Sequence, residues 1–237
     1  SRERGESNVA VRDAVAARIR EGMTTEEIDK IVSDTTTAAG AIAAPLNYEG
    51  FPKSVCTSVN DQVCHGIPSK DTVLKDGDIV NVDVSTIYKG YYSDSSRMFA
   101  IGKPNAERQN VMDMAKACMD AGIEQAKPWQ FLGDIAQAIQ DMAHSHGCTV
   151  VREVGGHGVG IDFHEEPYVS YVTKKGTDML LVPGMIFTIE PMINAGRHDI
   201  FVDEENDWTI YTDDGKPSAQ DEVTVLITEE GHEILAD

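Results

Sequence analysis

One short pattern occurs twice in this chain and restricts its fold more than any other feature. Residues 74–83 align with residues 181–190: in both, Leu stands nine positions and Gly six positions before an acid that ends an apolar, strand-like run. Residues 94–99 then parallel residues 222–227, where an acid again precedes a hydroxyl residue and an apolar stretch. A supersecondary unit that repeats in this way predicts two similar halves related by a pseudo-twofold axis.

Helical stretches precede the acidic segments in both halves. Thr24 is a capping residue followed by the early acids Glu26 and Glu27, which is typical of a helix N-terminus. Short β-branched runs between polar turns indicate strands. The expected helices are 9–19, 24–39, 106–127 and 132–146, and the expected strands lie in 54–67, 73–84, 91–101, 150–154, 185–193, 208–211 and 222–228, with a turn near Lys89 and Gly90.

This order of elements predicts an α+β fold. Each half reads as two helices followed by two strands that each carry an acid, so we expect duplicated α-β halves with a central antiparallel sheet covered by helices. The length of 237 residues fits one large domain or two small ones. We expect a single domain, 1–237, with halves at about 9–104 and 105–237.

Composition excludes several classes of protein. Hydrophobic residues make up 41% and charged residues 25%, which is ordinary for a globular protein, and no apolar run is long enough to span a membrane. The net charge of -20 disfavours nucleic acid and anionic membranes. The polar start offers no secretory signal, so we expect a cytoplasmic protein whose four cysteines are free thiols.

Four acids lie within or beside apolar strands, where a lone charge is costly to bury. They are Asp83, Asp94, Glu190 and Glu222, two in each half. Two equivalent hairpins would bring them to the middle of the sheet, where they would repel one another unless cations neutralise them. Oxygen ligands with some nitrogen suit Mn, Fe, Co or Zn. Taken singly, each acid could instead be a hairpin-end or solvated strand residue.

Three histidines are candidates for the nitrogen ligand or for catalysis. His157 lies among four glycines, which let a ring approach an ion closely, and His164 follows Phe163 seven positions later. The third is His65, beside a glycine and near a proline. The spacing is not that of the helical zinc-protease motif. A lone histidine in a glycine run is usually a turn residue, and we expect the remaining four histidines, His144, His146, His198 and His232, at the surface.

Seven short motifs, in order, resemble those of the type I methionine aminopeptidases, from about residue 9 onward. The resemblance implies the pita-bread fold of that dinuclear metallopeptidase family, which is the pseudo-twofold α+β domain expected above. The motifs are Val-Cys-His-Gly-Ile-Pro at 63–68, Asn-Val-Asp at 81–83, Asp-Ser-Ser-Arg-Met-Phe at 94–99, Gly-His-Gly at 156–158, Phe-His-Glu-Glu-Pro at 163–167, Phe-Thr-Ile-Glu-Pro at 187–191 and Ser-Ala-Gln-Asp-Glu at 218–222.

The resemblance also implies a role for each acid. Asp83 would chelate one divalent ion, His157 and Glu190 would bind a second, and Asp94 and Glu222 would bridge the two. Such a pair of ions lowers the pKa of a shared water, and the resulting hydroxide would attack the scissile carbonyl.

Other residues would handle protons and the developing charge. Glu190 would accept the proton, and His164 would donate to the oxyanion. His65 would position the second residue of the peptide and assist proton transfer.

The same resemblance points to a slot for the methionine side chain, where aromatic rings and a thiol suit a thioether. It also implies a monovalent-cation site near Asn60 and Ser218. The slot residues are Tyr48, Phe51, Cys56, Phe163 and Trp208, although each aromatic could equally be plain core.

Three positions depart from the usual family pattern. They are Pro45 at the slot rim, Asp221 before the expected ligand, and Val223 after it. None is itself an expected metal ligand.

The activity implied is removal of the N-terminal Met from nascent proteins and peptides when the second residue is small. The resemblance further implies a monomer associated with ribosomes. The alternatives are an X-prolyl aminopeptidase-like enzyme on the same fold and, from another class, a non-catalytic peptide-binding relative.

Overall fold

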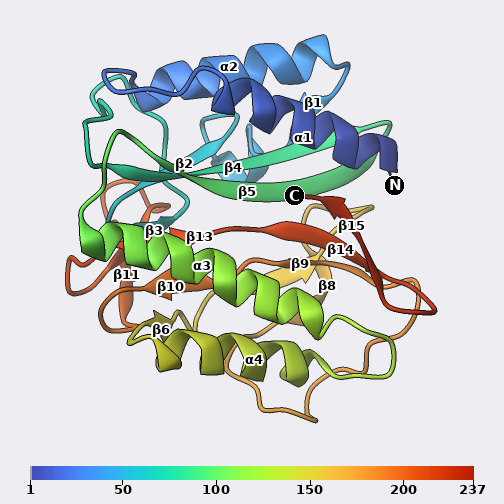
Figure 1. Cartoon of the computed structure of the whole chain (residues 1–237). Helices are drawn as coiled ribbons and strands as arrows, with labels where there is room; N and C mark the ends of the chain where they lie inside the picture. The colour runs from blue at the N-terminus through green and yellow to red at the C-terminus, as the bar shows by residue number, and fades with distance from the viewer. Residues whose placement is uncertain (1) are drawn as a thin grey trace.

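The computed structural model describes residues 2–237, apart from the side chains of Arg2 and Arg4. Four long helices flank antiparallel strands, with α1 and α2 beside the strands of the first half and α3 and α4 beside those of the second (Figure 1). The expected α+β class and its pseudo-twofold arrangement are confirmed. The helices are α1 (Arg2–Ala16), α2 (Thr25–Ala38), α3 (Ala106–Glu124) and α4 (Leu132–Ser145), with a short 3-10 turn at Tyr48–Gly50.

The strands form four small antiparallel sheets. In chain order they are β1 (Ile42–Ala43), β2 (Cys56–Val59), β3 (Gln62–Cys64), β4 (Ile79–Tyr88), β5 (Tyr91–Ala100), β6 (Thr149–Val150), β7 (Gly156–Gly158), β8 (Glu165–Val169), β9 (Ile186–Ile189), β10 (Met192–Asn194), β11 (Ile200–Val202), β12 (Ile210–Thr212), β13 (Ser218–Gln220), β14 (Val223–Ile227) and β15 (His232–Ala236). Sheet order is β1-β4-β2 with β5 on β4, then β15-β14-β9-β7-β8, β13-β10-β6 and β11-β12-β3.

The two longest strands, β4 and β5, form a hairpin in the sheet that also contains β1 and β2. All ten residues of each strand are paired, and the turn at Lys89 and Gly90 has φ of 51° and 82°. Positive φ at both central residues is the geometry of a two-residue hairpin turn whose twist matches its strands. The expected turn is therefore confirmed.

Each half has its own hydrophobic core. In the first half, Val11, Val15 and Ile28 from α1 and α2 pack against Val80 and Val82 of β4. In the second, a larger cluster joins α3 and α4 to β9, β10, β13 and β14; it includes Val111, Cys118, Ile135, Ile139, Phe187, Ile189 and Val225. A separate core in each half is what a duplicated helix–strand unit predicts.

Several expected boundaries are wrong. The first helix begins at Arg2 and ends at Ala16, and the expected strand 150–154 is limited to β6. The expected strand 185–193 is two strands that break at Glu190 and Pro191, where proline has no N–H to donate to the ladder. Likewise the strand expected over 73–84 starts at Ile79 and runs on to Tyr88. Asp83 therefore lies inside a strand rather than at its end.

The N-terminal cap of α2 gives a direct test of a local expectation. Thr24 accepts a hydrogen bond from the Glu27 amide at 3.2 Å, and Glu27 accepts one from the Thr24 amide at 2.7 Å. We expect Thr24→Ala to lower the free energy of unfolding by about 1 kcal/mol in urea denaturation, because it leaves an amide at the helix end unpaired. Thr37→Ala, an exposed change at the other end of α2, is the control; equal stability of both variants would contradict the cap.

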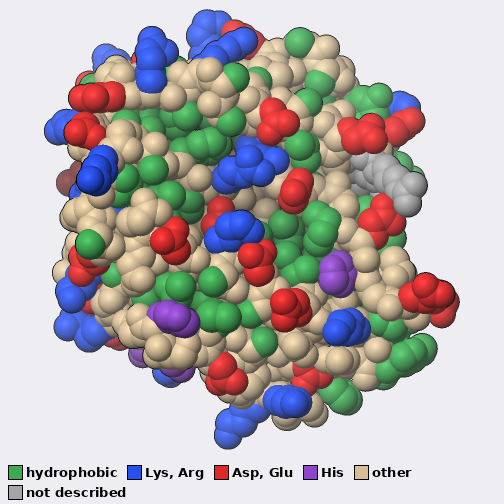
Figure 2. Space-filling model, viewed as in Figure 1, with side chains coloured by type: hydrophobic (Ala, Val, Ile, Leu, Met, Phe, Trp, Pro, Cys, Tyr) green, Lys and Arg blue, Asp and Glu red, His purple; other side chains and the backbone are tan. Residues whose placement is uncertain are grey.

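The surface and the thiols agree with the composition. Acidic and basic side chains are interspersed on the face shown in Figure 2, with no continuous basic patch among its described residues. All four cysteines, Cys56, Cys64, Cys118 and Cys148, are free and buried. None of the helices described is long and apolar enough to cross a membrane.

Candidate metal centre

Strand register brings the four candidate acids together. Asp83 of β4 pairs with Ser96 of β5, and Ser96 in turn forms a bridge with Glu222, through which the first half of the molecule meets the second. Asp94 lies two residues from Ser96 and so projects from the same face. The last pair of β9 and β14 is Ile189 with Val223, which places Glu190 beside Glu222. The duplicated hairpins thus meet at their acids.

His157 adds an imidazole to this group from β7. Its Nε2 lies 3.4 Å from Asp94 Oδ2 and 3.4 Å from Glu190 Oε1. Its Nδ1 lies 2.9 Å from the Gly158 carbonyl oxygen. Because a carbonyl oxygen can only accept, Nδ1 carries the proton and Nε2 is left to face the acids. Metal-binding histidines usually have this arrangement.

Neutral donors orient two of the carboxylates. Ser85 Oγ donates to Asp94 Oδ1 at 2.7 Å, and Thr188 Oγ1 donates to Glu190 Oε1 at 2.7 Å. The other oxygen of Glu190 accepts from Gln220 Nε2 at 2.9 Å. These bonds fix the carboxylates without neutralising their charge.

Three carboxylate oxygens of the cluster have no hydrogen-bond partner among the described residues. Asp83 Oδ1 and both side-chain oxygens of Glu222 are buried and accept no hydrogen bond from the described residues. Burial, reinforced by the charges of the neighbouring acids, raises the pKa of Asp83 and of Glu222 well above the ordinary values. Burial also raises the pKa of Glu190 to about 7. Buried acceptors without donors are costly in any protein that holds no cation there.

These observations test whether divalent ions suit the site. Ligand atoms of Asp94, His157 and Glu222 lie within 4.8 Å of one another, close enough to hold a single ion. Burial alone would lower the pKa of His157, but Asp94 and Glu190 raise it to about 9, so that in the metal-free chain a protonated imidazole supplies positive charge. Carboxylate oxygens with one nitrogen are ligands for divalent transition metals. The residues present fit such ions.

A cavity of about 360 Å³ lies beside the acids and is lined by Asp83, Asp94, His157 and Glu190. The other two candidate histidines, His65 and His164, line it as well. His164 is exposed, its ring centroid is 4.3 Å from that of His157, and its Nδ1 lies 2.9 Å from the Tyr48 hydroxyl. Although His164 is exposed as a residue, partial desolvation of its ring, together with the positive charge of the nearby His157, lowers the pKa of His164 to about 4, which leaves the ring neutral. His65 has a φ of 56° and a ring centroid 6.3 Å from that of Trp208. Both rings thus border the acids without being part of the closest cluster.

The five residues expected for the methionine slot also line this cavity. Tyr48 and Phe163 make an edge contact at 4.8 Å, and Phe51 and Trp208 make another at 5.2 Å. Cys56 is buried and pairs with Asp83 across β2 and β4, which puts the thiol next to the carboxylates. Aromatic and sulfur atoms therefore form one apolar end of the cavity.

The residues expected near a monovalent cation are neighbours in space. The Ser218 amide donates to the Asn60 carbonyl oxygen at 3.0 Å, and the Ser218 hydroxyl donates to Asn194 Oδ1 at 2.7 Å. These contacts do not test whether a cation binds there, so the monovalent ion remains a prediction.

The sequence reasoning missed several residues of the site. Ser85, Thr188 and Gln220 orient the acids, and the residues that line the cavity without having been predicted include Glu49, Glu153, Val154, Gly155 and Tyr168. Ser85 could have been found, because it lies two positions after Asp83 on the same face of one strand. The others depend on contacts between segments far apart in the chain, which leave no local signal.

One expectation about the remaining histidines is partly wrong. His144 and His146 are exposed as expected, whereas His198 and His232 are half-buried. His232 Nδ1 lies 3.0 Å from the Ala126 carbonyl oxygen, and His198 Nδ1 is buried with no partner. His232 thus contacts the loop after α3, whereas His198 borders a pocket with Gln140 and His144 of α4.

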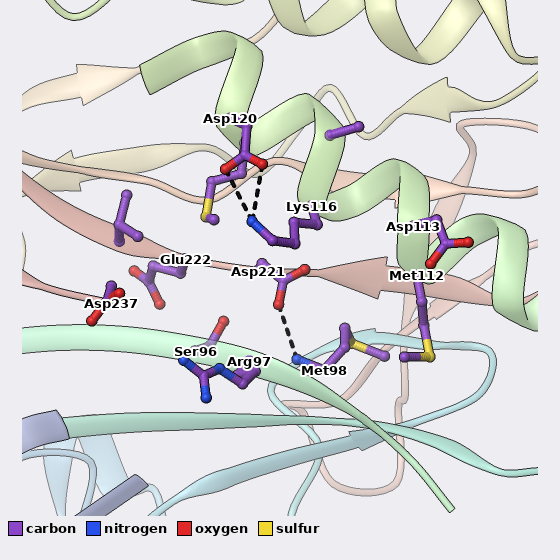
Figure 3. Close-up of a pocket in the computed structure, with 13 residues that line it drawn as sticks. Ser96, Arg97, Met98, Met112, Asp113, Lys116, Asp120, Asp221, Glu222 and Asp237 are labelled. Carbon is purple, nitrogen blue, oxygen red and sulfur yellow. Dashed lines mark hydrogen bonds and ion pairs between the residues drawn. The ribbon is translucent and has the colours of Figure 1, made fainter. Parts of the chain in front are cut away.

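A second cavity of about 510 Å³ lies between α3 and strands β5 and β14 (Figure 3). Its polar groups are mostly satisfied by one another: Asp221 accepts from the Met98 amide at 3.0 Å, and Lys116 pairs with Asp120 at 2.9 Å. Asp221 departs from the usual family pattern, and this hydrogen bond gives it a structural role. It joins β5 to the segment just before β14. Apart from Glu222, no residue expected for the site borders this cavity.

Buried carboxylates and one imidazole at the joint of a duplicated α+β fold define the class of metal-dependent peptidases with the pita-bread fold. The profile of metallopeptidase family M24 matches residues 1–229. This chain belongs to that family, which confirms the expected class of enzyme and divalent-metal binding in general.

The similar proteins are named methionine aminopeptidases. The chain is 45% identical over 234 residues to methionine aminopeptidase A of Synechocystis, covering 99% of this chain and 92% of that protein. The crystal structure of methionine aminopeptidase from Rickettsia prowazekii matches with a TM-score of 0.95 at 41% identity, covering 99% and 95% of the two chains. The corresponding Thermotoga maritima structure matches with a TM-score of 0.96 at 34% identity, covering 100% and 94%. The expected resemblance is confirmed.

Proposed function

We propose that this protein is a metal-dependent aminopeptidase that removes the N-terminal methionine from proteins and peptides. The observation that carries the proposal is the pairing, in one cavity, of an apolar aromatic end with a cluster of buried, partly unpartnered carboxylates. The methionine aminopeptidases to which the chain is similar over nearly its full length support the same activity.

We further propose that two divalent ions, from among Mn, Fe, Co and Zn, bind to Asp83, Asp94, His157, Glu190 and Glu222. Asp83 would belong to one ion, His157 and Glu190 to the other, and Asp94 and Glu222 to both. When bound, such a pair polarises the scissile carbonyl and lowers the pKa of a shared water to near neutrality.

The protein's own groups then have defined tasks. Glu190 is held by Thr188 and Gln220 and would take up the proton released on attack. His164 is neutral, so its Nε2 would donate to the oxygen of the cleaved carbonyl while Nδ1 accepts from the Tyr48 hydroxyl. His65, whose ring lies beside that of Trp208, would border the second residue of the peptide.

The preference for a small second residue follows from crowding. His65 lines the cavity, and the next residue, Gly66, is so tightly packed that a Cβ there would lie 1.9 Å from the Thr57 carbonyl oxygen. Because this segment has no room to move, a bulky side chain on the second residue would push the scissile carbonyl out of position. A displacement of about 1 Å costs about 10² in rate.

We therefore expect Met-Ala-Ser to be cleaved about 10² times faster than Met-Lys-Ser in a direct competition. An Ala-Pro peptide, the control for X-prolyl specificity, should not be cleaved. The release of free methionine is measured by chromatography. Equal rates for the first two peptides, or preferred cleavage of the third, would overturn the methionine assignment without affecting the metal centre.

The X-prolyl alternative has weaker support. The X-Pro aminopeptidase structure of Thermotoga maritima shares only 24% identity with a TM-score of 0.76, and the chain covers 59% of it. That likeness shows the fold alone.

Several finer features complete the proposal. We propose that residues 1–237 act as a single catalytic domain, that the protein is a cytoplasmic monomer, and that its substrates include nascent chains at the ribosome. Co-sedimentation with ribosomes and light scattering of the purified protein test the last two.

A further inference from the structure

One wall of the candidate active-site cavity carries a tyrosine that none of the roles above uses. Tyr168 of β8 lies directly opposite His157 of β7 in the antiparallel ladder. Residues directly opposite each other in such a pair project from the same face. Both side chains accordingly line the cavity.

The Tyr168 hydroxyl makes no hydrogen bond among the residues that the structure describes. The other two tyrosines near the acids are committed: the Tyr171 hydroxyl accepts from the Glu190 amide at 2.7 Å, and the Tyr48 hydroxyl lies 2.9 Å from His164 Nδ1. Tyr168 is instead 51% exposed and lines the cavity. Its hydroxyl is free to bind a ligand.

A neighbouring glycine leaves room for this hydroxyl. A Cβ placed on Gly155 would lie 3.0 Å from the Tyr168 hydroxyl oxygen and 3.1 Å from Cζ. The phenol end therefore rests on the backbone of Gly155, in space that any side chain there would fill. Burial and the charges of Glu190 and Glu153 raise the pKa of Tyr168, so the hydroxyl remains a donor.

The location of the apolar slot decides which part of a substrate meets Tyr168. The slot is built from ring contacts between Tyr48 and Phe163 and between Phe51 and Trp208. Tyr168 takes part in none of the ring contacts found among the described residues. Residues 153–155 and Tyr168 line the cavity outside this slot, so with a methionine side chain in the slot and its carbonyl at the acids, the peptide beyond the cleaved bond would pass these residues as well as His65.

We propose that the Tyr168 hydroxyl donates a hydrogen bond to the main-chain carbonyl of the substrate's second residue. This rests on the proposed aminopeptidase function and extends it, because it makes Tyr168 a binding residue for peptides as opposed to simple methionine amides. The contact is to the main chain, so it favours every peptide with a second residue, whatever its side chain.

The test compares two substrates in the Tyr168→Phe variant, which keeps the ring and removes only the hydroxyl. For Met-Ala-Ser we expect kcat/KM to fall about three- to tenfold, mainly through KM, as for one lost neutral hydrogen bond. For methionine p-nitroanilide, which has no second residue, the loss should stay below about twofold. Tyr91→Phe is the matched control: Tyr91 is 55% exposed and lies outside this cavity, so neither substrate should be affected.

Equal losses on both substrates would show a structural role for the hydroxyl and overturn the proposal, as would no loss on either. Thermal unfolding of both variants identifies a general loss of stability. If the unmodified protein cleaves neither substrate, the aminopeptidase function itself is wrong, and that outcome is distinct from a failure of Tyr168.

Discussion

Replacing Asp94 or Glu190 by alanine is expected to abolish peptide cleavage. Asp94 is 3% exposed and lies between His157 and the Ser85 hydroxyl, and Glu190 lies against His157, Thr188 and Gln220. Each variant removes a charge that the cations require and leaves the other carboxylates repelling one another. Methionine release and bound metal, measured by elemental analysis, should fall together.

Asp34→Ala is the control, because Asp34 is an exposed acid on α2 whose side chain is 65% accessible. It should retain full activity and metal. If Asp94→Ala or Glu190→Ala kept more than about a tenth of the wild-type rate with full metal content, a residual of about 1.4 kcal/mol in barrier, the dinuclear assignment would be wrong.

His164→Ala should have the second-largest effect, a loss of roughly 10²–10³ in turnover with metal content intact. The His164 ring borders the cluster without belonging to it: its Nδ1 is engaged by the Tyr48 hydroxyl, and it is exposed where the acids are buried. A donor of this kind acts on the charge that develops in the transition state, so the loss should appear in kcat more than in KM.

Metal content separates this role from that of a ligand. Loss of metal together with activity in His164→Ala would move His164 into the ligand set. Tyr48→Phe, which removes only the hydroxyl that orients the ring, should show a smaller loss of turnover in the same direction.

The sequence predicts the site better than it predicts the boundaries of the elements. An acid inside an apolar strand is costly wherever it lies, so Asp83, Asp94, Glu190 and Glu222 are visible from local sequence alone. Their repetition at matched spacing then indicates a shared centre. The alternation of apolar and polar residues that marks a strand does not show where the strand ends. For this reason β4 extends four residues beyond its expected end at residue 84.

What the sequence could not predict depends on packing between distant segments. Tyr168 follows Glu165, Glu166 and Pro167 and resembles any strand residue; its role appears only because β8 pairs with β7 in the register that sets it opposite His157. Gln220 is equally unmarked in sequence. It reaches Glu190 because β13 pairs with β10, opposite Met192.

The central claim is that this fold holds a metal-dependent aminopeptidase. Its most direct test is the release of free methionine from Met-Ala-Ser by chelator-treated protein, before and after stoichiometric addition of Mn(II) or Co(II). We expect no release from the stripped protein and recovery that saturates at two ions per chain, with methionine and Ala-Ser as the products. Full activity in the absence of metal, or recovery that yields Met-Ala instead of methionine, would contradict the account.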